Sequence, residues 1–337
     1  MSEVLVETKN LVKEFKIRRR FGGGDRFIRA VDNVSITLRE GENLALVGES
    51  GSGKSTLGRL TLGLLRPTSG NVFYMGKDIW KMTKEEFREF RRNAQIIHQD
   101  PYSSFNPVKT IFYSLSTPLL HHKIARNKRE AYHMVADLLR RVGLEPPSDF
   151  MNRYPSRMSG GQLQRIAIAR AISLRPKYIV ADEAVSMLDA SLRLGIIDLL
   201  LDLQKEYGLS YLFITHDLGI TRYFIHKGGG KVAVMYLGSL VELGKGEEVI
   251  RNPYHPYTRI LVEASPIPDP KMARSRGIPK LRSLDIPSLT NVPPGCKFSS
   301  RCPYADTICE KKVPEYRKVD DRLVACHYAE QFKTGEL

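Results

Sequence analysis

Short apolar runs alternate with stretches of helical periodicity along roughly the first 250 residues. Short β-rich runs bounded by glycine lie at Leu44–Val47 and Asn71–Tyr74, and short apolar runs follow at Tyr178–Ala181, Tyr211–Ile214 and Lys231–Met235. The helical patterns lie between them, over Lys54–Leu65, Lys84–Arg92, Lys128–Val142, Gly161–Leu174 and Ser191–Tyr207. Short, nearly continuous apolar runs are typical of buried parallel strands, and their alternation with helices predicts an α/β core.

The pattern changes at two places along the chain. Residues 101–158 have no clear strand and are rich in helix formers, which predicts a helical insertion into the α/β core. Nine of the 19 prolines lie between Pro253 and Pro294, so this stretch is expected to be extended rather than helical. We therefore expect one domain over residues 1–250 and a C-terminal extension over residues 251–337.

Composition and charge narrow the class of protein. The chain has 337 residues, 42% of them hydrophobic, and a formal net charge of +15, which excludes a fibrous or wholly disordered protein. No apolar stretch is long enough to cross a bilayer, and the N-terminus lacks a secretory pattern, so we expect a cytoplasmic protein. The basic excess indicates a nucleic acid, a nucleotide or a lipid surface as partner, or merely a solvated surface.

The segment Gly48–Thr56 has the sequence GESGSGKST, between an apolar run and a helical pattern, and fits the phosphate-binding motif GxxxxGK[ST]. Its glycines let backbone N–H groups turn toward phosphates at the start of the helix. Lys54 is expected to reach the β- and γ-phosphates, and Ser55 to place its hydroxyl on Mg²⁺. The residues that we expect to bind ATP here are Gly48, Ser50, Gly51, Ser52, Gly53, Lys54, Ser55 and Thr56.

Two further patterns fit phosphate chemistry. Asp182 and Glu183 end the apolar run Tyr178–Ala181, so Asp182 could hold Mg²⁺ while Glu183 polarises an attacking water. The sequence Ser159-Gly160-Gly161-Gln162 opens a helical pattern. This sequence is typical of a capping box, in which the Ser and Gln side chains bond to the first turn of the helix. Its two glycines also leave the helix N-terminus open to an anion held by another subunit.

Taken together, these motifs resemble the nucleotide-binding subunit of an ATP-binding-cassette (ABC) transporter over residues 1–250. The resemblance implies a P-loop NTPase (RecA-like) domain with an antiparallel β subdomain and a helical insertion. It assigns Gln99 to Mg²⁺ sensing, His216 to the γ-phosphate and Asp189 to a loop at the dimer interface. Phe15 corresponds to the aromatic residue that stacks on adenine, although Phe27 or Ile28 could take that place. Lys54, Glu183 and His216 are then the catalytic residues, and Ser159–Gln162 binds the ATP of the partner subunit.

The last third of the chain resembles the C-terminal extension of dipeptide and oligopeptide importer ATPases, from Asn252–Thr258 and Pro266–Pro270 onward. Four cysteines lie within it, at Cys296, Cys302, Cys309 and Cys326. Their confinement to one segment argues for a metal site over disulfides, and their spacing fits zinc poorly. A [4Fe–4S] cluster, which the resemblance implies for some relatives, is therefore expected, with zinc or unmetallated thiols as alternatives.

The resemblance implies an ATP-hydrolysing subunit that powers the import of peptides or oligosaccharides, with ATP and Mg²⁺ as cofactors. Its implied partners are two membrane-spanning permease subunits, a second ATPase subunit and an extracytoplasmic solute-binding protein, with the chain peripheral on the cytoplasmic face. The alternative is an ABC-type ATPase acting on nucleic acid or ribosomes. The 105 residues from Lys54 to Ser159 leave no room for a long coiled coil, and the single cassette also argues against that alternative. We therefore expect no nucleic-acid partner.

Overall fold

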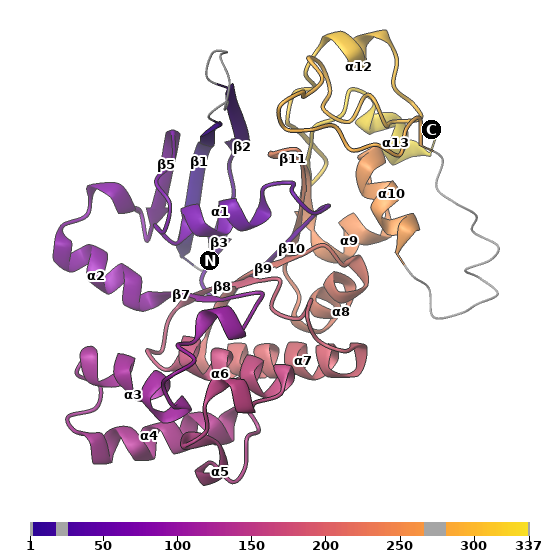
Figure 1. Ribbon diagram of the computed structural model, residues 1–337. Coiled ribbons are helices and arrows are strands. Elements are labelled where there is room, and N and C mark those ends of the chain that lie inside the picture. The colour runs from indigo at the N-terminus through magenta and orange to yellow at the C-terminus, as the bar shows by residue number, and fades with distance from the viewer. Residues whose placement is uncertain (1–2, 18–25, 266–280, 336–337) are drawn as a thin grey trace.

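A computed structural model describes residues 3–17, 26–265 and 281–335, and Figure 1 shows its arrangement. Within these residues the strands form a large mixed sheet and a smaller antiparallel sheet. The large sheet contains, in spatial order, β12 (Arg317–Val319), β13 (Arg322–Val324), β11 (Ser239–Lys245), β10 (Lys231–Tyr236), β4 (Asn43–Val47), β9 (Ser210–Thr215), β8 (Tyr178–Asp182) and β7 (Ala94–Ile97).

The five strands from β10 to β7 are parallel, and this confirms the predicted α/β core. Alternate residues of β4 point to opposite faces of the sheet, as a period of two requires. Leu44 and Leu46 pack in one core with Leu57 and the small sheet, and Ala45 and Val47 pack in the other. Helices cover the sheet, namely α1 (Lys54–Thr61), α6 (Gly160–Ile172), α7 (Ala190–Tyr207) and α8 (Leu218–Gly228).

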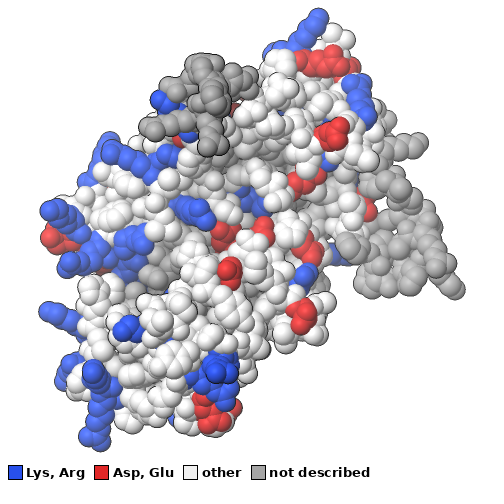
Figure 2. Space-filling view, in the orientation of Figure 1, with Lys and Arg blue, Asp and Glu red and all other residues white. Residues whose placement is uncertain are grey.

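The small sheet is antiparallel and packs over α1, as the ABC resemblance implied. Its strands are β1 (Val4–Ile17), β2 (Arg26–Val34), β3 (Thr37–Arg39), β5 (Ser69–Tyr74) and β6 (Lys77–Asp78). Between it and β7 lie η1 (Ile79–Lys81) and α2 (Lys84–Asn93). Figure 2 shows Lys and Arg side chains gathered on the side of the molecule that carries α2 and the helices below it.

Residues 101–158 are helical, which confirms the predicted insertion. The insertion contains η2 (Tyr102–Ser104), α3 (Ile111–His121), α4 (Lys128–Arg141), α5 (Ser148–Met151) and η3 (Pro155–Arg157). Helices α3, α4 and α5 lie below α6 and α7 in Figure 1, and buried side chains of α3, α4 and α6 pack in one core.

The C-terminal region continues the large sheet. After β11 come α9 (Gly246–Arg251) and α10 (Pro256–Ala264), and further along α12 (Thr307–Lys311) and α13 (Ala329–Thr334). Strand β13 pairs with β11 and β12 pairs with β13, so the extension adds two strands to the edge of the large sheet. The expectation of extended chain after Pro253 is wrong for α10, because Pro256 occupies the first turn, where its missing N–H costs no hydrogen bond. The segment Pro266–Pro270 lies outside the described residues.

The described helices include none that is long and apolar enough to cross a membrane.

Candidate ATP site

The phosphate loop connects β4 to α1, as its sequence predicted. Gly53 has φ 104°, and an added Cβ would lie 2.1 Å from the carbonyl oxygen of Ala30. Gly48 is similarly enclosed, because its Cβ would lie 2.1 Å from the Met235 carbonyl oxygen. Only glycine fits these two positions, so the loop depends on backbone atoms of β2 and β10 for its shape.

Lys54 is folded back into this loop. Its Nζ donates hydrogen bonds to the carbonyl oxygens of Gly48 at 2.7 Å and Glu49 at 2.8 Å, and the residue is only 4% exposed. Burial lowers the pKa of Lys54, while the carboxylates of Glu183 and Asp182 oppose that shift. The ammonium group therefore lies at the centre of the loop, where a polyanion would be neutralised.

Ser55 and Asp182 come together across the site. The Ser55 hydroxyl donates to Asp182 Oδ1 at 2.8 Å, joining the start of α1 to the end of β8. Burial raises the pKa of Asp182, and the Ser55 hydrogen bond opposes this shift. A hydroxyl and a carboxylate are the oxygen donors that Mg²⁺ accepts beside phosphate oxygens, so this pair fits the metal that the sequence predicted.

Gln99, Glu183 and His216 form one cluster. Gln99 Nε2 donates to Glu183 Oε2 at 3.0 Å, and His216 Nδ1 lies 3.3 Å from Glu183 Oε1. The three residues follow β7, β8 and β9, whose carboxyl ends meet at one edge of the sheet. Gln99 therefore contacts Glu183, whereas the Mg²⁺-type oxygen pair is Ser55 with Asp182.

The backbone of Glu183 has an unusual conformation. Its φ is 48°, in the left-handed region that side chains other than glycine rarely adopt. Its N–H donates to the Ile214 carbonyl oxygen at 2.9 Å, which ties the residue to β9. Such conformations persist where the surrounding structure imposes them, and they are common at functional sites.

Ser159 begins α6 with the predicted capping box. Its hydroxyl accepts the N–H of Gln162 at 3.3 Å, and the Gln162 side chain accepts the Ser159 N–H at 3.1 Å. Gly160 and Gln99 line the same pocket, together with Met187 from the loop before α7. The Ser159–Gln162 segment therefore lies beside Gln99 of its own chain.

Two predicted residues lie on the surface. Asp189 is exposed and begins α7 without a capping hydrogen bond from its side chain. Phe15 is 40% exposed on β1, where it pairs with Ile28 of β2 and has the Lys13 ammonium 5.3 Å from its ring centroid. Both have accessible side chains, and their roles stay predictions.

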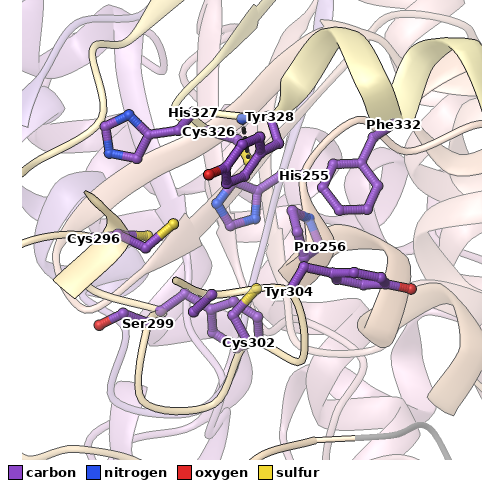
Figure 3. A pocket seen from close by; sticks show the side chains of 13 residues that line it. His255, Pro256, Cys296, Ser299, Cys302, Tyr304, Cys326, His327, Tyr328 and Phe332 are labelled. Carbon is purple, nitrogen blue, oxygen red and sulfur yellow. Dashed lines mark hydrogen bonds between the residues drawn. The ribbon is translucent and has the colours of Figure 1, made fainter. Parts of the chain in front are cut away.

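The predicted iron–sulfur site is not supported. The four cysteines line one pocket of the C-terminal extension (Figure 3). Nevertheless, no group of three or more His, Cys, Asp or Glu side chains among the described residues is placed to hold a metal ion. Burial raises the pKa of Cys296 to about 11 and those of Cys302 and Cys326 to about 12. Because these side chains are not grouped to hold a metal ion, the [4Fe–4S] prediction for Cys296, Cys302, Cys309 and Cys326 was wrong.

Packing and ion pairs hold the extension instead, and some of them reach the phosphate loop. Arg301 forms a two-pronged ion pair with Glu49, and the Tyr257 hydroxyl accepts the Glu49 N–H at 2.9 Å. Sequence analysis missed these contacts. Glu49 occupies a position that the motif leaves unspecified, and Arg301 follows it by 252 residues.

Comparison with known proteins identifies the family. Residues 31–186 match the family described as ABC transporter, and residues 241–309 match the oligopeptide/dipeptide transporter C-terminal region. The chain is 45% identical over 329 residues to a probable peptide ABC transporter ATP-binding protein of Sinorhizobium fredii, covering 97% of this chain and 90% of the relative. This chain belongs to the ATP-binding subunits of ABC transporters.

Other relatives of this ABC subunit agree. The oligopeptide transport ATP-binding protein OppF of Escherichia coli is 43% identical over 327 residues, which cover 96% of each chain. A dimeric ATP-binding cassette solved in a post-hydrolysis state with ADP and Pi has a TM-score of 0.62 and 29% identity, over 72% of this chain and 98% of that one. The chain is thus an ABC-type ATPase with the predicted cassette fold, and the relatives support the transporter prediction over the nucleic-acid alternative.

Proposed function

We propose that this ABC subunit hydrolyses ATP between the phosphate loop of one subunit and the Ser159–Gln162 segment of another, and so powers peptide import. The observation that carries the proposal is the position of Glu183. Its carboxylate lies between Gln99 and His216 at the sheet edge where β8 also presents Asp182. A carboxylate held in this way is suited to accept a proton from an attacking water.

The residues divide the work of phosphoryl transfer. Lys54 and the backbone of the phosphate loop bind and orient the triphosphate. Ser55 and Asp182 hold Mg²⁺, which supplies charge neutralisation on the phosphates when it is bound. Glu183 accepts a proton from the attacking water. The oxygen of that water forms a bond to the γ-phosphorus, and the bond between this phosphorus and the oxygen shared with the β-phosphate breaks. His216 orients that water, and Gln99 connects the reaction to the helical insertion.

The partner subunit completes the site in this proposal. Ser159 and Gln162 form reciprocal hydrogen bonds in the capping box. Gly160 and Gly161 lie between them at the start of α6 and have no side chains that could cover the helix end. A γ-phosphate can therefore approach the backbone N–H groups of this helix end. A second ATPase subunit, identical or different in sequence, would present its own segment to the ATP that this chain holds.

The relatives' names support the cargo and the assembly. The relatives from Sinorhizobium fredii and Escherichia coli are described as peptide and oligopeptide transport proteins. We assign peptides to this chain on that basis. Two permease subunits and a solute-binding protein are assigned from the family resemblance. The chain itself would be peripheral, on the cytoplasmic face, with part of its basic surface toward anionic lipids.

Substitution of Glu183 tests the catalytic proposal. In the assembled transporter, Glu183→Gln should bind ATP with unchanged affinity and lose at least about 100-fold in hydrolysis rate, because an amide cannot accept the proton. Equilibrium binding of a fluorescent ATP analogue and phosphate release measure the two effects. Glu247→Gln, an exposed change on α9, is the matched control. Hydrolysis near the wild-type rate in Glu183→Gln would remove Glu183 from this role.

Uptake into proteoliposomes tests the cargo. The transporter, assembled with its solute-binding protein, should accumulate labelled di- to pentapeptides in an ATP-dependent manner and exclude labelled oligosaccharides. Accumulation of oligosaccharides alone would overturn the assignment of peptides while leaving the ATPase proposal intact.

A further inference from the structure

Arg301 of the C-terminal extension reaches into the phosphate loop of its own chain. Its two terminal nitrogens donate to the two carboxylate oxygens of Glu49, at 2.7 Å and 2.9 Å. Arg301 is 5% exposed, and the Glu49 side chain is 24% exposed. This geometry is the bidentate guanidinium–carboxylate pairing, which fixes orientation as well as charge.

A second contact from the extension acts on the backbone of the same residue. Tyr257, fully buried on α10, accepts the N–H of Glu49 with its hydroxyl at 2.9 Å. The Tyr257 ring packs against Tyr236 at 4.5 Å and against Phe298 at 5.3 Å between centroids. Arg301 lies over both of these neighbours, 5.8 Å from each centroid. Glu49 is therefore held at its main chain and its side chain by one packed unit.

The charge of Glu49 makes this arrangement consequential. A carboxylate in a loop that receives a triphosphate repels its ligand unless a cation neutralises it, and Lys54 is already directed at the loop carbonyls. Burial lowers the pKa of Arg301, but its hydrogen bonds to Glu49 outweigh this effect and raise the pKa overall. The guanidinium therefore remains charged and neutralises the carboxylate.

We propose that Arg301 and Tyr257 are positioning residues, which hold the phosphate loop in its ATP-binding conformation by fixing the side chain and the N–H of Glu49. The C-terminal extension is then a part of the ATP site, although it contributes no atom to the reaction. This inference rests on the proposed ATP site at Gly48–Thr56, and the experiment below separates the two.

The test measures ATP binding and hydrolysis separately in four variants. Arg301→Gln should raise the Kd for a fluorescent ATP analogue and the KM of the assembled transporter about tenfold, with kcat within about twofold of wild type. Arg301→Lys keeps the positive charge but loses the bidentate guanidinium, and should bind the ATP analogue much more tightly than Arg301→Gln does. Glu49→Gln keeps one oxygen for Arg301 and removes the negative charge, so it should raise the Kd less than Arg301→Gln does. The double variant Glu49→Gln/Arg301→Gln should bind ATP better than Arg301→Gln alone, because the uncompensated carboxylate is gone.

Two controls separate positioning from general destabilisation. Arg322→Gln breaks a buried ion pair with Glu242 that also joins the extension to the sheet but does not touch the phosphate loop. It should lower the thermal unfolding midpoint and leave the KM unchanged. An equal rise in KM for Arg322→Gln would overturn the inference, because docking of the extension alone would explain it.

The remaining outcomes also decide between the proposals. Lys54→Ala should abolish binding of the ATP analogue, and binding that survives this change would overturn the ATP site itself. If Lys54→Ala abolishes binding while Arg301→Gln leaves the KM within twofold, the site stands and the role of Arg301 is overturned. If Arg301→Gln does not fold, Arg301→Lys carries the test, with an expected threefold rise in KM and an unchanged KM as the contrary result.

Discussion

Gly53 shows how strongly a single position can limit the phosphate loop. Its φ of 104° and the Ala30 carbonyl oxygen, 2.1 Å from where a Cβ would lie, both exclude a side chain. We expect Gly53→Ala to lower the free energy of unfolding by about 2–4 kcal/mol and to weaken ATP binding at least tenfold, because the loop must shift to relieve the clash. Urea unfolding and nucleotide titration measure the two effects.

Gly41 provides the matched control for this change. It has φ 73°, but an added Cβ would meet no atom within 4 Å. Gly41→Ala should therefore lower the free energy of unfolding by only about 1 kcal/mol, because alanine must adopt a left-handed backbone conformation there. It should leave ATP binding unchanged. Equal losses of stability in the two variants would show that backbone conformation, and not the Ala30 carbonyl, makes Gly53 necessary.

At this residue scale, the sequence predicts contacts best where each partner lies in a short motif at the end of a strand. Ser55 and Asp182 were predicted to share Mg²⁺, and their side chains are hydrogen-bonded 127 positions apart. That was predictable because parallel strands bring their carboxyl ends to one edge. The Glu49–Arg301 pair was not predictable, since neither residue has a fixed spacing or a motif around it. The error about the cysteines came from their spacing and from the resemblance, because spacing does not determine where buried sulfur atoms point.

Among the elements, α10 depends on a neutral histidine. His255 is 2% exposed, and its Nδ1 accepts the N–H of Tyr257 at 3.0 Å as the helix cap. Burial lowers the pKa of His255 to about 3. Below about pH 6.5 the unfolded chain binds a proton that the folded chain does not, so the free energy of unfolding falls with acidification by up to about 1.4 kcal/mol per pH unit.

Urea unfolding at several pH values tests this prediction. Between pH 6.5 and 5, wild type should lose about 2 kcal/mol more stability than His255→Asn, whose amide can cap the helix without titrating. His226→Gln, at an exposed position of α8, should follow wild type. A pH dependence shared by wild type and His255→Asn would assign the acid sensitivity to other groups.

The same element shows where prediction of secondary structure failed. Pro256 and the prolines after it favoured an extended chain, yet α10 begins at Pro256. The helix forms because a proline in the first turn lacks only an N–H that would have no partner within the helix, and because Tyr257 gains a fully buried site. Local composition contains no information about that tertiary contact.

For the whole molecule, the extension and the cassette share one sheet. Glu242 of β11 is completely buried, and it receives the N–H groups of Tyr254 and His255 at 3.0 Å each and the Arg322 guanidinium at 3.4 Å. A chain ending after Ser265 would keep the carboxylate but lose the cation and uncover the edge of β11. Removing one partner of a buried ion pair costs about 3–5 kcal/mol, so we expect this truncation to unfold at a markedly lower temperature.

Calorimetry of the truncated chain measures this effect, and a chain ending at Thr334 serves as the control. The outcome also tests the predicted domain boundary. An unchanged midpoint would show that the cassette is independent of the extension, as the expected division at residue 250 assumes. A lowered midpoint would mean that both parts unfold as one cooperative unit.

The Glu49–Arg301 pair also limits how such subunits can be recombined. An exchange of C-terminal regions at residue 250 would transfer Arg301 without the carboxylate it recognises, whenever the recipient has another residue at position 49. A viable chimaera of two related ATPases should therefore exchange the second loop residue together with the tail. The two residues that must be exchanged together are therefore far apart in the sequence, with one in the phosphate loop and the other 252 residues downstream.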